Sequence, residues 1–181
     1  MTFIEAPPDR DAGDLTNSER AFLHRPNVMA AWVQLNGATK ENMDLRRYEL
    51  ATVAAARRLR SSYCALAHGS VLMKEYVGPE ELVSIAADHH AAGLDEVDVA
   101  VMDFAETVAG DATSVTQADV DRLRGLGLSD TEIFDVATAA AVRCFFSKTL
   151  DALGVQPDAH YAAMDAELRD LLVVGRPIAD E

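Results

Sequence analysis

The sequence is poor in several features, and each shortage excludes a class of protein. Two cysteines in 181 residues exclude a disulfide framework, so both thiols are expected to be reduced. No apolar run reaches the roughly 18 residues of a transmembrane helix, so no membrane partner is expected. Lysine and arginine number 16 against 30 acidic residues, and the resulting net charge of −14 argues against general nucleic-acid binding.

What the sequence contains favours an all-α, compact multi-helix fold. Hydrophobic residues make up 49% and charged residues 25%, as in ordinary globular proteins. Alanine is abundant and alternation of β-branched residues is nearly absent, which favours helices. We expect an N-terminal arm over residues 1–15, one helical domain over 16–175 and a tail over 176–181. The first residues lack the apolar stretch of a signal peptide, so a cytoplasmic location is expected.

Capping residues and breakers predict where the helices begin and end. Asp44 is a suitable N-cap for a long helix, and Ser129 with Glu132 forms a capping-box pattern. Gly37 is expected to end an early helix. The predicted helices cover residues 18–24, 27–36, 44–60, 62–77, 79–90, 94–109, 116–125, 129–153 and 158–174.

The stretch 49–68 holds the most reactive group of side chains in the chain. Cys64 and His68 are four residues apart, so they share a face if the segment is helical. A thiol beside an imidazole is the minimum equipment for an activated cysteine. Cys64 would lie in the first turn of its helix, where free backbone N–H groups stabilise a thiolate. A buried, inert cysteine and a hydrogen-bonded core histidine remain the structural alternative.

Glu49 could orient or charge the thiol and imidazole pair. It lies at the edge of the apolar stripe of its helix, away from the arginines, which lie on the opposite face of that helix. A carboxylate there is either paired at the margin or buried, and burial would raise its pKa. An ion pair with Arg46, or a hydrogen bond inside the core, is the structural alternative to a catalytic role.

These residues resemble the core motif of the carboxymuconolactone decarboxylase and alkylhydroperoxidase D-like superfamily. In the peroxidase branch the motif is a Glu, a Cys-x-x-Cys pair and a His four residues after the second Cys. The spacing from Glu49 to Ser61, Cys64 and His68 fits without a gap. The resemblance covers roughly residues 25–154. It implies an alkylhydroperoxidase D-like helical domain without a cofactor, assembled as a homo-oligomer, commonly a trimer or hexamer.

One departure from the family pattern changes the chemistry. Ser61 stands where the family has its first cysteine, and a hydroxyl cannot form the disulfide that two thiols form in the family. The resemblance therefore implies Cys64 as the thiol that attacks peroxide, His68 as its proton partner and Glu49 as the relay carboxylate. Ser61 and Tyr63 are expected to have supporting roles, with the Tyr63 hydroxyl as a further relay group.

Three functions remain open on this sequence. The first is a one-cysteine peroxidase that reduces a hydroperoxide through Cys64 and is restored by an external thiol. The second is a decarboxylase-like enzyme that moves protons through Glu49 and His68 on a small lactone or organic acid, with Arg46 or Arg143 holding a carboxylate. The third is a catalytically inert helical oligomer.

The sequence gives weaker support to metal binding and to a second reactive thiol. Glu49, Cys64 and His68 could bind zinc by type, but a fourth ligand is missing and no metal is expected. His89 and His90 are interpreted as a pair that complements a helix dipole. Cys144 is a conceivable resolving thiol, although its apolar surroundings in the sequence indicate buried packing.

Overall fold

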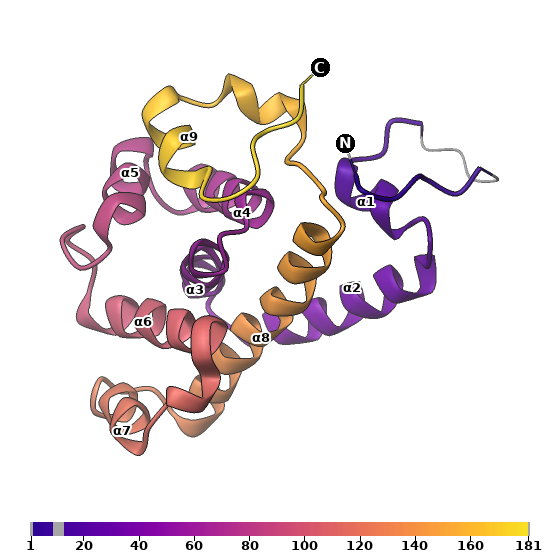
Figure 1. Ribbon diagram of the computed structural model, residues 1–181. Coiled ribbons are helices and arrows are strands. Elements are labelled where there is room, and N and C mark those ends of the chain that lie inside the picture. Colours follow the sequence, from indigo (N-terminus) through magenta and orange to yellow (C-terminus); the bar gives the residue numbers. More distant parts are fainter. Residues whose placement is uncertain (1, 9–12, 181) are drawn as a thin grey trace.

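The computed structural model describes residues 2–8 and 13–180, and this part of the chain is built of helices without strands (Figure 1). None of its helices is both long and apolar enough to cross a membrane. The α-helices are α1 (Asn17–Phe22), α2 (Pro26–Lys40), α3 (Leu45–Arg58), α4 (Ser62–Glu75), α5 (Pro79–Asp88), α6 (Glu96–Asp111), α7 (Gln117–Gly125), α8 (Asp130–Ala152) and α9 (Ala166–Leu172), with 3₁₀ turns η1 (Ala112–Ser114) and η2 (Ala159–Ala163).

Helix α3 is the central element of the fold. It packs against α4, α6 and α8, and Figure 1 shows it surrounded by these three helices. Its N-terminus is capped as predicted, because the Asp44 side chain accepts a hydrogen bond from the Arg47 backbone N–H. Small residues such as Ala51 and Ala55 are fully buried on α3 and let its neighbours approach closely.

Two hydrophobic clusters meet at α3. The first joins α3 to α4, α5 and α9 through residues that include Leu66, Leu72 and Leu172. The second joins α3 to α6, α7 and α8 and includes Val101 and Leu123. A polar side chain of α3 such as Glu49 is therefore enclosed by neighbouring helices on several sides.

Two of the predicted helix boundaries are wrong. Helix α2 continues through Gly37 to Lys40, because Gly37 keeps a helical conformation and Glu41 forms the C-cap instead. The segment 158–174 is not one helix. Met164 is extended, and the Asp165 side chain accepts hydrogen bonds from the backbone N–H groups of Glu167 and Leu168. This cap starts α9 as a separate helix.

Segments near both ends of the described chain, at Phe3 and Arg176, lie against the C-terminal end of α8. The Phe3 N–H donates to the Leu153 carbonyl at 2.8 Å, and the Arg176 guanidinium lies 4.8 Å from the centre of the Phe3 ring. The predicted arm includes residues 1 and 9–12, and the predicted tail includes residue 181, which lie outside the described residues. The domain boundaries themselves stay a prediction.

The turn between α3 and α4 is closed by the C-terminal segment. Arg60 takes a positive φ of 58°, which an L residue rarely adopts, and its Nε donates to the Val174 carbonyl at 3.2 Å. The Gly175 N–H donates to Ser62 Oγ at 2.8 Å. A Cβ atom at position 175 would overlap the carbonyl oxygen of Arg60, so this contact requires glycine.

We predict that Gly175→Ala destabilises the protein by about 1–3 kcal/mol, because two backbone segments would have to separate. Urea unfolding measures the difference. The matched control is Gly37→Ala, where an added Cβ meets nothing within 4 Å inside an exposed helix. That change should stabilise by roughly 0.5–1 kcal/mol. Equal stabilities for both variants would contradict the close approach at Gly175.

Candidate active site

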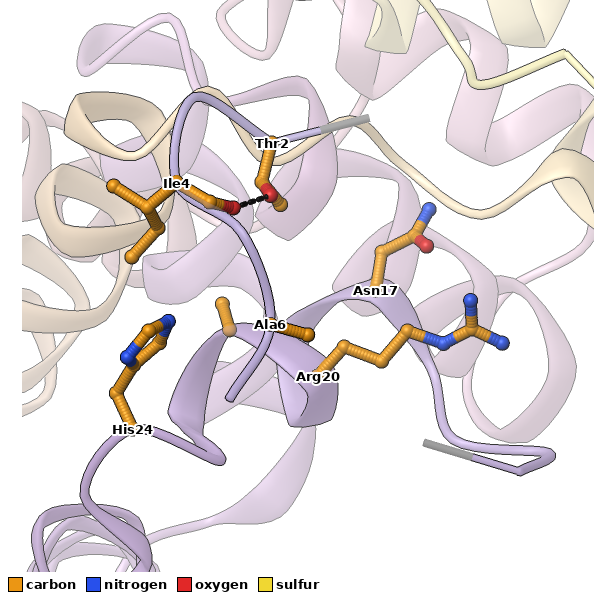
Figure 2. Close-up of a pocket in the computed structure, with 7 residues that line it drawn as sticks. Thr2, Ile4, Ala6, Asn17, Arg20 and His24 are labelled. Atoms are coloured by element: carbon orange, nitrogen blue, oxygen red, sulfur yellow. Dashed lines mark hydrogen bonds between the residues drawn. The ribbon is translucent and has the colours of Figure 1, made fainter. Parts of the chain in front are cut away.

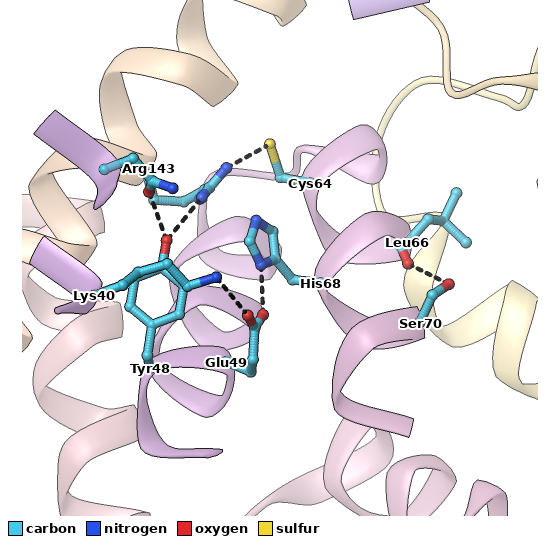
Figure 3. Close-up of polar contacts among 9 residues, drawn as sticks. Lys40, Tyr48, Glu49, Cys64, Leu66, His68, Ser70 and Arg143 are labelled. Carbon is cyan, nitrogen blue, oxygen red and sulfur yellow. Dashed lines mark hydrogen bonds and ion pairs between the residues drawn. The ribbon is translucent and has the colours of Figure 1, made fainter. Parts of the chain in front are cut away.

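The structure joins Glu49 of α3 directly to His68 of α4. His68 Nδ1 lies 2.5 Å from Glu49 Oε2, so the two share a short hydrogen bond (Figure 3). The Glu49 side chain is 2% exposed and that of His68 is 15% exposed. The carboxylate is therefore buried at the interface of two helices, where it needs partners to offset its loss of hydration.

Lys40 supplies the second partner of Glu49. Its Nζ lies 3.3 Å from Glu49 Oε1 and 4.5 Å from the centre of the Tyr48 ring. Lys40 was missed by sequence reasoning, because α2 was expected to end at residue 36. The helix pattern beyond Gly37 was the signal that could have found it.

Cys64 faces Arg143 of α8. The Arg143 Nη1 group lies 3.6 Å from Cys64 Sγ, and Nη2 lies 3.4 Å from the Tyr48 hydroxyl oxygen, as Figure 3 shows. The Tyr48 hydroxyl in turn donates to Asn36 Oδ1 at 2.6 Å. Cys64 lies in the first turn of α4, as predicted, one helical turn before His68.

Arg143 is a buried cation without a carboxylate partner in the described part of the chain. Its side chain is 2% exposed, and its Nε has no hydrogen-bond partner. The guanidinium lies 5.7 Å from the centre of the Trp32 ring and 5.8 Å from that of Phe146. Aromatic faces stabilise a cation only in part, so this site favours an anion beside the guanidinium.

Burial and the neighbouring cations favour a neutral His68. Burial lowers the pKa of His68 to about 4, with the Arg143 and Lys40 charges acting in the same direction against the opposing effect of Glu49. Burial acts to raise the pKa of the Glu49 carboxyl, but the hydrogen bond to His68 and the Lys40 charge outweigh it and lower that pKa. Glu49 is therefore ionised and His68 is neutral at pH 7.

The predicted site residues are brought together only in part. Glu49 and His68 are bonded, whereas no hydrogen bond joins Cys64 to either of them among the described residues. Figure 3 shows the Glu49 carboxylate on one side of the His68 ring and the Arg143 guanidinium on the other. Arg143 is thus the group that lies near both the thiol and the imidazole.

Of the two residues expected to support the site, Tyr63 faces away from the Glu49 and His68 pair. The Tyr63 hydroxyl donates to Asp158 Oδ2 at 2.7 Å and contacts Ser18 Oγ at 3.0 Å, so it faces α1 rather than the Glu49 and His68 pair. Burial raises the pKa of Tyr63, which keeps its proton on the oxygen. Ser61 is fully buried at the N-cap position of α4, three residues before Cys64.

Arg46 and Cys144 also differ from the roles considered for them. Arg46 binds the buried Asp98 carboxylate together with Arg47, so it is not the partner of Glu49. Cys144 packs against the second hydrophobic cluster while Cys64 belongs to the first. Burial raises the pKa of the Cys144 thiol, and both cysteines are free thiols.

A separate hollow of about 210 Å³ lies between the N-terminal segment and α1 (Figure 2). Figure 2 shows Asn17, Arg20 and His24 of this region beside the segment that carries Thr2 and Ile4. The guanidinium of Arg20 is already bonded to the Leu15 and Gly13 carbonyl oxygens. The residues that line the hollow include neither a thiol nor a carboxylate, so the chemistry of the chain lies elsewhere.

An acid, an imidazole and a thiol thus lie at the contact of three helices, α3, α4 and α8. Residues 26–107 match the model of the carboxymuconolactone decarboxylase family. Over these residues, which make up less than half of the sequence, the chain is similar to that family. No curated protein matches the sequence.

Solved structures share this fold at low sequence identity. An uncharacterized peroxidase-related protein of Ralstonia eutropha JMP134 with an alkylhydroperoxidase D core is 24% identical, with a TM-score of 0.74 over 83% of this chain and 80% of that one. A peroxidase-related protein of Silicibacter sp. TM1040 is 18% identical, with a TM-score of 0.79 over 90% and 94%. The debrominase Bmp8, in complex with 2,3,4-tribromopyrrole, is 15% identical, with a TM-score of 0.71 over 88% and 82%.

We predict that the stability of the protein falls as the pH falls from about 6.5 to about 4. In this window the unfolded chain binds a proton at His68 that the folded protein does not, because the folded pKa is about 4. The loss should be on the order of 3 kcal/mol at complete protonation. Glu49 adds a loss of the same sign at lower pH, because its folded pKa is depressed.

Urea unfolding at a series of pH values measures this dependence, and NMR titration of His68 reads its pKa directly. His68→Gln should flatten the dependence, whereas the exposed His160 serves as the matched control through His160→Gln. A titration of His68 at or above the ordinary value near 6.5 would contradict the neutral imidazole.

Proposed function

We propose that this protein is a thiol-dependent, peroxidase-like oxidoreductase that reduces hydroperoxides through Cys64. The observation that carries the proposal is the contact of 3.6 Å between Cys64 Sγ and a buried guanidinium that has no carboxylate partner in the described residues. A cation in that position stabilises negative charge on sulfur, and the thiolate is the nucleophilic form of cysteine.

Similarity to the superfamily supports the same reaction class at a coarse level. The spacing of Glu49, Cys64 and His68 agrees with the peroxidase branch, and two of the solved structures above are called peroxidase-related. A peroxide reductase must keep its thiol reduced between turnovers. We therefore propose a cytoplasmic location, where thiols remain reduced, in agreement with two free cysteines.

Glu49 and His68 have a defined division of roles in this proposal. Because the ionised Glu49 can only accept, His68 carries its proton on Nδ1 and presents Nε2 as a proton acceptor. The neutral imidazole takes the thiol proton, and Arg143 holds the negative charge that remains on sulfur. Tyr48 positions Arg143 through its hydroxyl group.

The chemical step then balances in atoms and charge. The Cys64 thiolate attacks one oxygen of ROOH, the O–O bond breaks, and sulfur becomes a sulfenic acid while RO⁻ leaves. His68 returns its proton to RO⁻ and gives ROH. An external thiol attacks the sulfenic acid with loss of water, and a second equivalent releases Cys64 and a disulfide. Ser61 cannot take the place of the external thiol, because a hydroxyl forms no disulfide.

We predict that Cys64→Ser abolishes both hydroperoxide turnover and labelling by a sulfenic-acid trap, because the nucleophile is removed. The readout is the rate of cumene hydroperoxide consumption with dithiothreitol as reductant. Cys144→Ser is the matched control and should keep both signals. Peroxide-dependent labelling that persists in Cys64→Ser and disappears in Cys144→Ser would reassign the reactive thiol.

We predict that Arg143→Met slows sulfenic-acid formation at Cys64 by roughly 100-fold, because a buried group that stabilises developing charge is lost. Arg143→Lys keeps the charge and should recover part of the rate. Single-turnover oxidation followed by mass spectrometry measures both. Equal rates in Arg143→Met and the wild type would show that the guanidinium does not act on the sulfur.

A second candidate is proton transfer of the decarboxylase type on a small organic acid. The bonded Glu49 and His68 pair favours it, together with a guanidinium that could hold a carboxylate. The two functions differ in their dependence on sulfur. Activity on a small lactone acid that survives Cys64→Ser and is lost in His68→Gln would support this second function over the first.

We also propose that the chain works as a homo-oligomer, with a trimer or hexamer as the expected state. Exposed apolar side chains on α2 and α8 support this proposal, since burial of such residues drives association. They are Val33, Leu35, Phe134 and Phe145, and between 45% and 67% of each is exposed. A monomer in sedimentation equilibrium at micromolar concentration would exclude it.

A further inference from the structure

A cluster of metal-ligating side chains lies away from the candidate active site, between the end of α5 and the middle of α6. His89 forms the C-cap of α5 and His90 follows it, while Asp103 belongs to α6. Both His89 Nε2 and His90 Nε2 lie 3.0 Å from the same oxygen, Asp103 Oδ1. Two imidazoles thus converge on one carboxylate.

The three donor atoms are close enough to share one ion. They all lie within 4.8 Å of one another. In a tetrahedral zinc site each donor is about 2.1 Å from the metal, which separates the donors by roughly 3.4 Å. Small rotations of the side chains would therefore replace the hydrogen bond of His89 and the close contact of His90 to Asp103 by three bonds to a metal.

Arg122 of α7 fixes the carboxylate in the orientation that this site needs. Its Nη1 donates to Asp103 Oδ2 at 2.9 Å, so the other oxygen, Oδ1, is the one left facing the imidazoles. Outer-sphere bonds of this kind orient metal-ligating carboxylates. The positive charge of the Arg122 guanidinium also disfavours a bound cation. The site therefore suits a metal that binds imidazole strongly better than one held mainly by the charge of a carboxylate.

We propose that His89, His90 and Asp103 form a binding site for a divalent transition metal of the zinc class. Two imidazoles and one carboxylate suit Zn²⁺ and Co²⁺ better than Mg²⁺ or Ca²⁺, which prefer oxygen ligands. Three protein ligands leave a coordination position open, as in hydrolytic zinc sites.

The surroundings place that open position at the surface. The His89 side chain is 8% exposed and anchors the site, whereas that of His90 is 56% exposed and faces solvent. His90 and Arg122 border a surface hollow of about 570 Å³, which Glu96 and Val99 also line. Water or a small ligand can therefore reach an ion bound there.

This site is independent of the proposed peroxidase chemistry. None of its ligands contacts Glu49, Cys64 or His68, which lie at the contact of α3, α4 and α8. A test of metal binding at His89, His90 and Asp103 therefore gives a result that does not depend on whether Cys64 reacts with peroxide.

The test titrates Zn²⁺ into the full-length, reduced protein by isothermal titration calorimetry after treatment with a chelator. We expect one Zn²⁺ per protomer. Affinity should fall by roughly 10- to 100-fold or more in His90→Gln and in Asp103→Asn. Because His90 is exposed, the first variant is expected to fold even if the second is destabilised. His160→Gln, which removes another exposed imidazole, should leave the affinity unchanged.

Co²⁺ absorption spectra identify the ligand type. With His89, His90 and Asp103 as ligands, we expect a Co²⁺ spectrum without a thiolate-to-metal charge-transfer band. We also expect Co²⁺ binding to persist in Cys64→Ser. Absence of one-to-one Zn²⁺ binding in the wild type would overturn the proposal. So would unchanged affinity in His90→Gln, or a site that disappears in Cys64→Ser.

Discussion

Burial of charge at the contact of α3, α4 and α8 is the constraint on which this structure depends. Glu49 is almost fully removed from water, and it is tolerated because His68 and Lys40 bond to its two oxygens. Arg143 is equally buried on the other side of the His68 ring, but no carboxylate meets it in the described residues. The buried carboxylate therefore has a partner for each of its oxygens, whereas the buried guanidinium has no anion beside it.

This asymmetry separates two tasks that a cysteine site otherwise combines. In many activated thiols one histidine has both tasks: it takes the proton of the thiol, and once protonated it provides the positive charge beside the sulfur. Here the positive charge is permanent and belongs to Arg143, while burial, together with the Arg143 and Lys40 charges, keeps His68 neutral. An imidazole that stays neutral remains available as a proton acceptor over a wide range of pH. Glu49 then serves to fix its tautomer and orientation.

Local features could be predicted from the sequence, and contacts between distant segments could not. The caps at Asp44 and Ser129 form within a few residues, so their patterns identified α3 and α8 correctly. Gly37 was misread because glycine stops a helix only where the chain needs a left-handed residue, and α2 continues through it. That error concealed Lys40, whose partner Glu49 lies nine residues further on.

The contact of Arg143 with Cys64 spans 79 residues and depends on how α8 packs across α4. A single arginine in an apolar run was visible in the sequence, but its target was not. Tyr63 shows the same limit, because its neighbour Cys64 faces α8 while its own hydroxyl reaches α1 and Asp158. Spacing identifies residues on one helix face and leaves their partners on other helices undetermined.

The rate at which iodoacetamide alkylates Cys64 at neutral pH tests the central claim most directly, because it reports the nucleophilicity of the sulfur without a peroxide. The account predicts a rate that Arg143→Met lowers and that Cys144→Ser leaves unchanged. Alkylation of Cys64 that is equally fast after loss of Arg143 would contradict it.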